Sequence, residues 1–173
     1  ALDATQVAAI TTTQIKALST TQLKALDTTD VGELSSTQVA AMSAAQIGAL
    51  SSTSLASLDT TQLGALTAAQ IGALSNTSLS GLDATQISGL TTTQVGGLTT
   101  SQLRGLSTTD FGELTSTQIN SLSAAQLGAI TATNIGSLDA TQVAALSTTQ
   151  VKGLATTQLA GLTTTDIGEL DAT

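Results

Sequence analysis

Residues 18–25 read Leu-Ser-Thr-Thr-Gln-Leu-Lys-Ala, and variants of this octad make up the whole 173-residue chain. A Leu, Ile or Met opens every octad, at a spacing of eight that is unbroken from Leu2 to Leu170. Numbered from that residue as position 1, 21 full octads fit between Leu2 and Glu169. A fixed short period is the signature of stacked repeats, so the sequence predicts one uninterrupted solenoid over residues 1–173, expected to be part of a longer array.

Positions 2 and 5 of the octad carry the signal of a helix start. Position 2 is Ser, Thr or Asp in nearly every octad and position 5 is mostly Gln, as in Thr11 and Gln14. This is the capping-box spacing, and the apolar residues at positions 1 and 6, such as Ile10 and Ile15, have the spacing of a hydrophobic staple. The next cap arrives eight residues later, which leaves about four to six helical residues per octad. Helices this short persist only when they stack, so we predict an all-α solenoid of short capped helices.

Two other folds compete with this prediction. One continuous helix is excluded because at about 100° per residue the row of position-1 residues would drift by about 80° per octad. A β-solenoid is the alternative, since Thr, Val and Ile favour strands. In a single strand, however, positions 1 and 6 would point to opposite faces, so a corner would have to separate them. The sequence therefore favours helices over strands.

A second, longer period lies above the octad. Position 5 departs from Gln at steps of 3, 3, 4, 3 and 4 octads. One distinct face of a superhelix would produce such a period, so we predict about 3.5 octads per superhelical turn. Duplication of seven-octad blocks is the alternative, because residues 83–114 resemble residues 139–170, but residues 50–57 and 74–81 repeat after only three octads. The residues that replace Gln at position 5 are Asp30, Ser54, Ser78, Asp110, Asn134 and Asp166.

The composition removes most catalytic chemistry. The chain has no His, Cys, Trp, Tyr or Pro. Imidazole general bases, thiolate nucleophiles and Cys/His zinc sites are therefore excluded, and we predict neither an enzyme nor a cofactor. A net charge of -8 with only four Lys and Arg residues opposes binding to nucleic acid. No apolar run reaches 18 residues, so membrane insertion is not expected either.

Three octads contain an Asp-x-Gly-Glu segment, at residues 30–33, 110–113 and 166–169. Carboxylates three residues apart could bind calcium, but calcium takes six to eight oxygen ligands and these segments lack a dense acidic loop. The simpler interpretation is an Asp at the third helical position, favoured by the helix N-terminus, followed by a solvated Glu. We therefore predict no catalytic, cofactor-binding or metal-binding residue.

Two further groups of polar residues stand out. Lys16, Lys24, Arg104 and Lys152 all occupy position 7 and are interpreted as solvated residues. Thr triplets at residues 11–13, 91–93 and 163–165 resemble the flat Thr arrays of ice-binding solenoids. Against that function, the first Thr of each triplet is needed as a helix cap, and Ser, Asp or Ala interrupts every row.

The unit Thr-Thr-[Gln/Asp]-[Ile/Leu/Val]-x-[Ala/Gly]-Leu resembles octapeptide repeat arrays of very large bacterial secreted or surface proteins, including adhesin-like and calcium-repeat proteins. Ser54, Ser78 and Asn134 depart from that pattern. The resemblance implies an extracellular or cell-surface protein in which the array spaces or presents other domains, and it carries over no catalytic residue.

These observations predict a non-catalytic structural spacer or stalk whose partners are neighbouring repeats or domains of the same chain. The alternative is a binding module that uses one repetitive face for ice, a polymer or a protein. Leu2 and Leu170 keep the internal pattern where a capping repeat would turn polar, so end-to-end self-association is also expected.

Overall fold

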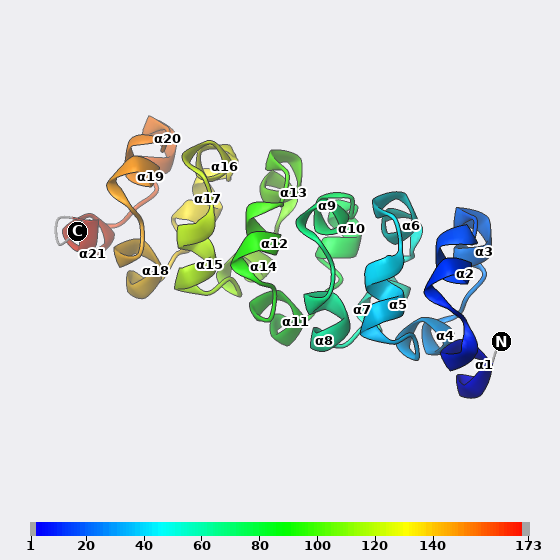
Figure 1. The fold of residues 1–173 in the computed structure, drawn as a ribbon. Helices are drawn as coiled ribbons and strands as arrows, with labels where there is room; N and C mark the ends of the chain where they lie inside the picture. The colour runs from blue at the N-terminus through cyan, green and yellow to red at the C-terminus, as the bar shows by residue number, and fades with distance from the viewer. Residues whose placement is uncertain (1–2, 171–173) are drawn as a thin grey trace. The chain divides into compact units, whose positions relative to one another are not determined.

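The computed structural model describes residues 3–170, and within them it contains 21 α-helices and no strand (Figure 1). One helix falls in each octad, and the helices are four to seven residues long. The prediction of an all-α solenoid of short helices is confirmed, and the β-solenoid alternative is wrong. The helices form two compact units, Ala1–Leu90 and Thr91–Thr173. The octad pattern runs through the sequence of both units, and a single continuous domain over residues 1–173 stays a prediction.

The first unit contains eleven helices, each separated from the next by two to four residues. They are α1 (Ala4–Ala9), α2 (Thr12–Ala17), α3 (Thr20–Lys24), α4 (Thr28–Gly32), α5 (Ser36–Ala41), α6 (Ala44–Ala49), α7 (Ser52–Ala56), α8 (Thr60–Gly64), α9 (Ala68–Gly72), α10 (Asn76–Leu79) and α11 (Ala84–Ser88).

The second unit contains the remaining ten. They are α12 (Thr92–Gly96), α13 (Thr100–Gly105), α14 (Thr108–Gly112), α15 (Ser116–Ser121), α16 (Ala124–Ala129), α17 (Ala132–Ile135), α18 (Ala140–Ala144), α19 (Thr148–Lys152), α20 (Thr156–Leu159) and α21 (Thr164–Leu170).

The predicted capping box starts most of these helices. At α5, the Gln38 backbone N–H donates to Ser35 Oγ at 3.2 Å, and the Ser35 N–H donates to Gln38 Oε1 at 2.6 Å. Asp59 and Gln62 form the same pair of bonds at 2.8 and 2.6 Å. Two backbone donors that a helix start leaves without intrahelical partners are satisfied in this way. The local capping chemistry read from the sequence is therefore confirmed.

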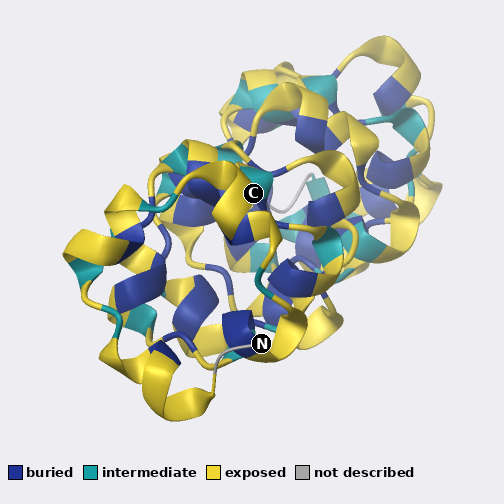
Figure 2. Ribbon diagram, turned by 90° about the vertical axis from the view of Figure 1, so that its right-hand side faces the viewer, coloured by how far each residue is buried: buried dark blue, intermediate teal, exposed yellow. Residues whose placement is uncertain are grey.

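Positions 1 and 6 form the core. Every buried hydrophobic residue of the described chain stands at one of these two positions, and Figure 2 shows the buried segments recurring from helix to helix. Position 6 is the more completely buried in the interior octads, with Ile47 and Phe111 at 0% exposure. The hydrophobic stabilisation is thus spread evenly along the array instead of being concentrated in one centre.

Within each unit most helices pack on the helix three places further along the chain. In the first unit α2 packs on α5 and α6 on α9, and in the second α12 packs on α15 and α18 on α21. Hydrogen bonds between successive turns span 28 to 31 residues. Helices three octads apart pack together while the hydrogen bonds between turns reach 28 to 31 residues, so these contacts agree with the predicted period of about 3.5 octads within each unit.

Candidate functional site

The most distinctive chemical feature of the structure is a row of Gln side chains at position 5, most of which are buried. Each side chain has two roles, which Gln38 shows clearly. Its Oε1 accepts from the cap of its own helix, while its Nε2 donates to Ile10 O at 2.7 Å and to Val7 O at 2.8 Å. Those carbonyls lie at the C-terminal end of α1, one superhelical turn earlier. One side chain therefore caps the start of its own helix and the end of another.

The same bonds recur in the second unit. Gln158 Nε2 donates to Ile130 O at 2.7 Å and to Leu127 O at 2.9 Å, the same separations of 28 and 31 residues. A helix leaves its last four carbonyls without intrahelical partners, and helices of five residues consist almost entirely of such ends. In both units the Gln row donates hydrogen bonds to some of these helix-end carbonyls. Members of the row that make inter-turn bonds include Gln38, Gln46, Gln62, Gln70, Gln86, Gln126, Gln142, Gln150 and Gln158.

The departures from Gln each keep part of this arrangement. Asn134 Nδ2 still donates to Leu106 O at 3.0 Å, 28 residues earlier, although its helix lacks the capping box. Asp166 keeps the cap, since its Oδ2 accepts from the Thr163 N–H at 2.7 Å, but a carboxylate has no proton to donate to a carbonyl. Ser54 bonds only locally, to Ser51 Oγ at 2.8 Å.

Sequence reasoning found the capping role of the Gln row and missed its inter-turn role. The signal was present, because the substitutions at position 5 recur at the superhelical period of about 3.5 octads. The sequence does not show where the Nε2 end of the side-chain amide points. The capping box uses only Oε1, and nothing local indicates that Nε2 reaches a carbonyl 28 residues away.

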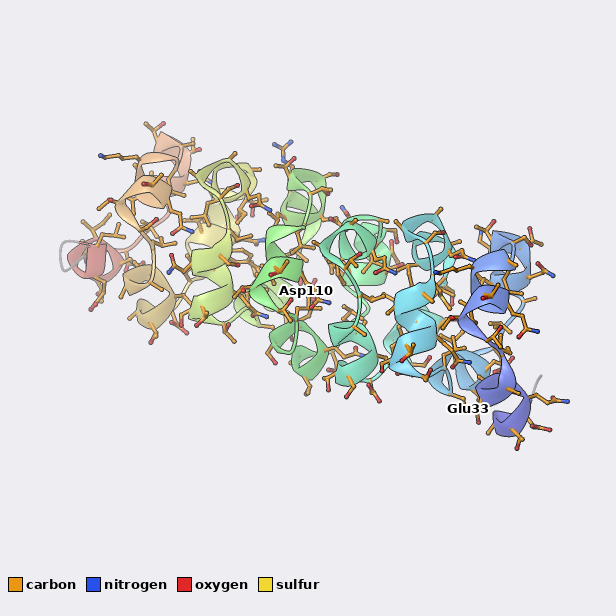
Figure 3. All side chains as sticks on the ribbon, in the orientation of Figure 1. Glu33 and Asp110 are labelled. Carbon is orange, nitrogen blue, oxygen red and sulfur yellow. The ribbon has the colours of Figure 1, made fainter. Side chains whose placement is uncertain are left out.

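The acidic segments are dispersed. Asp30 is buried and its Oδ2 accepts from the Asp27 N–H at 3.1 Å, as predicted for a residue at the third helical position. Figure 3 labels Glu33, which is exposed at the end of α4, and Asp110, which is half-buried on α14. Glu113 and Glu169 are half-buried, so the predicted full solvation of the Glu holds only at Glu33. Within residues 3–170 no group of three acidic side chains lies close enough to hold a metal ion.

The other polar residues singled out from the sequence lie on the outside. The four cations at position 7, Lys16, Lys24, Arg104 and Lys152, are exposed, as predicted. Residues 91–93 and 163–165 are exposed along their whole length, and Thr91 and Thr163 also act as helix caps. In the part of the chain that the structure describes, no helix has the length and apolar character needed to cross a membrane.

The octads, their caps and the bonds between turns define a tandem-repeat solenoid, which is a structural repeat module. The model of the ALTTAQ repeat family matches residues 7–44, 23–58, 39–76, 96–124 and 103–140. These overlapping matches cover more than half of the chain, which therefore belongs to the ALTTAQ repeat family. The six letters correspond to octad positions 8 to 5, and residues 65–70 of this chain read Ala-Leu-Thr-Ala-Ala-Gln. A search of curated proteins gave no match.

Proposed function

We propose that this array is a non-catalytic spacer or stalk in a large extracellular or cell-surface protein, where it holds other domains at a set distance. The Gln row is the observation that supports this function. The same side chain joins one superhelical turn to the next in both units, as Gln38 and Gln158 do. An array held by such local contacts lengthens by one layer for each turn that is added, so repeat number sets reach.

The proposed partners are neighbouring repeats or domains of the same long chain. A net charge of -8 opposes a nucleic-acid partner. The surface location and the adhesin-like context rest on the resemblance of the octad to arrays in bacterial secreted proteins.

A pair of spin labels within the first unit tests the spacer. Thr5 and Thr85 are exposed, and the chain contains no Cys, so Thr5→Cys with Thr85→Cys places labels at those two sites alone. The two sites lie almost three turns apart, and layers of packed helices are about 8–10 Å thick. We expect a narrow distance distribution. The pair Thr5→Cys with Thr61→Cys, three octads shorter, should give an equally narrow distribution with an axial separation smaller by about one layer. Broad distributions in both pairs would contradict a spacer.

A second candidate function is binding along one repetitive face, and the exposed Thr triplets favour it. Thr92→Lys combined with Thr164→Lys would change two of those triplets without touching a cap or a buried residue. A binding module should adsorb to ice or to a polymer and lose that adsorption in the variant. A spacer should show the same label distances in both proteins and no adsorption in either.

A further inference from the structure

The hydrogen bonds that join successive turns are interrupted at regular intervals in the first unit. From α5 to α11, two helices whose position-5 Gln bonds to an earlier helix end are followed by one that carries Ser instead. The Ser residues are Ser54 on α7 and Ser78 on α10. The Gln residues with inter-turn bonds in this stretch are Gln38, Gln46, Gln62, Gln70 and Gln86. Every third helix here thus lacks the amide that joins it to the turn before.

The two Ser side chains bond locally and do not reach the earlier turn. Ser78 is 5% exposed, and its Oγ accepts from Ser75 Oγ at 2.9 Å. The residue 28 positions earlier is Leu50, the C-cap of α6, and no hydrogen bond from residues 3–170 reaches Leu50 O. The same holds for Leu26 O, 28 positions before Ser54. On the Gln-bearing helices of this stretch, an amide nitrogen donates to the carbonyl in this place.

The two interruptions lie on the same side of the first unit. Helix α7 packs on α4 and on α10, so Ser54 and Ser78 occupy the same octad position on neighbouring turns. We call the side chains of Ser54 and Ser78, together with Leu26 O and Leu50 O, the serine seam. The other sides of the unit include the packed pairs α5 with α8 and α6 with α9, whose position-5 residues are all Gln. Amides therefore join the turns on those sides and not at the seam.

Apolar packing is the main contact that closes the serine seam. Leu55 on α7 and Leu79 on α10 are 0% and 1% exposed, so the core continues behind the seam. The carbonyl of a buried residue such as Leu50 loses its water on folding, and without a donor it gains no hydrogen bond in return. Local opening of a protein starts where stabilising contacts are fewest. Separation of the turns therefore costs least along the seam.

We propose that the serine seam is a hinge built into the first unit. The turns separate transiently at the seam while the Gln bonds hold them on the other sides, so the unit bends in one direction, away from the seam. The open state is a minor population, and the unit therefore keeps its length at rest but yields in a defined direction under load. This inference does not depend on the spacer function, since the opening is a property of the folded chain by itself.

Native-state hydrogen exchange of the 173-residue protein, followed by NMR, tests the hinge. Leu50 and Leu79 N–H lie at the seam, and Met42 and Ile71 N–H occupy the same octad positions where Gln70 joins the turns. All four N–H groups donate to a backbone carbonyl at 3.0 to 3.2 Å, and all four residues are buried. We expect protection factors at Leu50 and Leu79 at least tenfold below those at Met42 and Ile71. Equal protection of the two pairs would overturn the inference.

Restoring the amide should close the seam. Ser78→Gln gives α10 the side chain that the neighbouring helices use, and it should raise the protection factors at Leu50 and Leu79 at least tenfold. The matched control is Ser80→Gln, which adds the same side chain to the same octad at an exposed position and should leave both values unchanged within about twofold. An equal gain in the two variants would show that the added Gln acts without joining the turns, and would contradict the hinge.

The reverse substitution should create a second seam. Gln70→Ser removes the donor to Met42 O, so protection at Met42 and Ile71 should fall at least tenfold while the circular dichroism stays that of the folded parent. Unchanged protection at these two amides would refute the role of the amide. An equal loss at every amide of the first unit would mean that the unit opens as a whole and has no hinge. The distance between labels at Thr5 and Thr85 tests the spacer separately, so the two proposals can fail independently.

Discussion

Replacing Gln38 by Glu should destabilise the array strongly although the change is nearly isosteric. The carboxylate can still accept from the Ser35 N–H, but it cannot donate to Val7 O and Ile10 O, which now receive a bond each at 2.8 and 2.7 Å. Each lost bond is worth about 0.5–1.5 kcal/mol, and leaving buried polar groups unsatisfied costs about 1–3 kcal/mol more. Gln38 is only 4% exposed, so water cannot replace the lost hydrogen bonds to these carbonyls. We expect Gln38→Glu to lower the free energy of unfolding by about 3–4 kcal/mol at pH 7.

Gln14→Glu is the matched control for this prediction. Gln14 occupies the same octad position and caps its own helix through the same bond, at 2.8 Å, but it is exposed. The two variants have the same net charge, and of the two residues only Gln38 makes hydrogen bonds between turns. Urea unfolding followed by circular dichroism should show Gln14→Glu within about 0.5 kcal/mol of the parent. Equal stability of the two variants at low protein concentration would refute the structural role assigned to the row.

The pH dependence of the Gln38→Glu variant gives a second test. Burial and the facing carbonyl oxygens disfavour the charged form, so they raise the pKa of the introduced carboxyl above its unfolded value of about 4.3. A raised folded pKa means that the native state binds the proton more tightly than the unfolded state. The destabilisation is therefore complete above the folded pKa, and it diminishes as the pH falls towards about 4, where the neutral carboxyl can donate one bond again. A deficit that is independent of pH would contradict this explanation.

Further predictions concern single contacts and the length of the array. A Cβ at Gly48 would lie 2.7 Å from Ala73 O, so Gly48→Ala should cost about 1–3 kcal/mol, whereas Gly64→Ala meets nothing within 4 Å and should be neutral or stabilising by up to about 1 kcal/mol in chemical unfolding. Ala155 has the extended backbone of the other caps but no side-chain acceptor, so Ala155→Ser should add about 1 kcal/mol to the free energy of unfolding, and no gain would argue against capping as a source of stability. A peptide of residues 34–57 is shorter than the 28-residue separation between turns and should remain unfolded by circular dichroism. Helical structure in that peptide would show that the short helices do not depend on stacking.

The sequence was sufficient to predict the parts of this fold that are local. Caps and helix length follow from contacts within eight residues. The capping box is confirmed, as at Thr11 and Gln14, and the helices are four to seven residues long where four to six were predicted, while the staple stays a prediction. The superhelical period could be predicted as well, because the residue type at position 5 changes with that period. The contacts that join the turns could not be predicted from the sequence. The approach of Gly48 to Ala73, for example, depends on the distance at which the turns stack, and so does that of Gln38 to Ile10.

The chemistry of position 5 explains why this row holds Gln so often and never Glu. The side chain at position 5 has to accept a hydrogen bond from the cap N–H and to donate one to the carbonyls of the preceding turn. A planar amide group does both, because it has an acceptor oxygen and a donor nitrogen. A shorter acid is tolerated, as at Asp166, because its carboxylate stays at the cap. A longer acid would place a charge among carbonyl oxygens in a buried layer, where it has no compensation. Stability in this array therefore depends on the position-5 amides that act between turns. Octads can be added in any number while the surface residues remain free to vary.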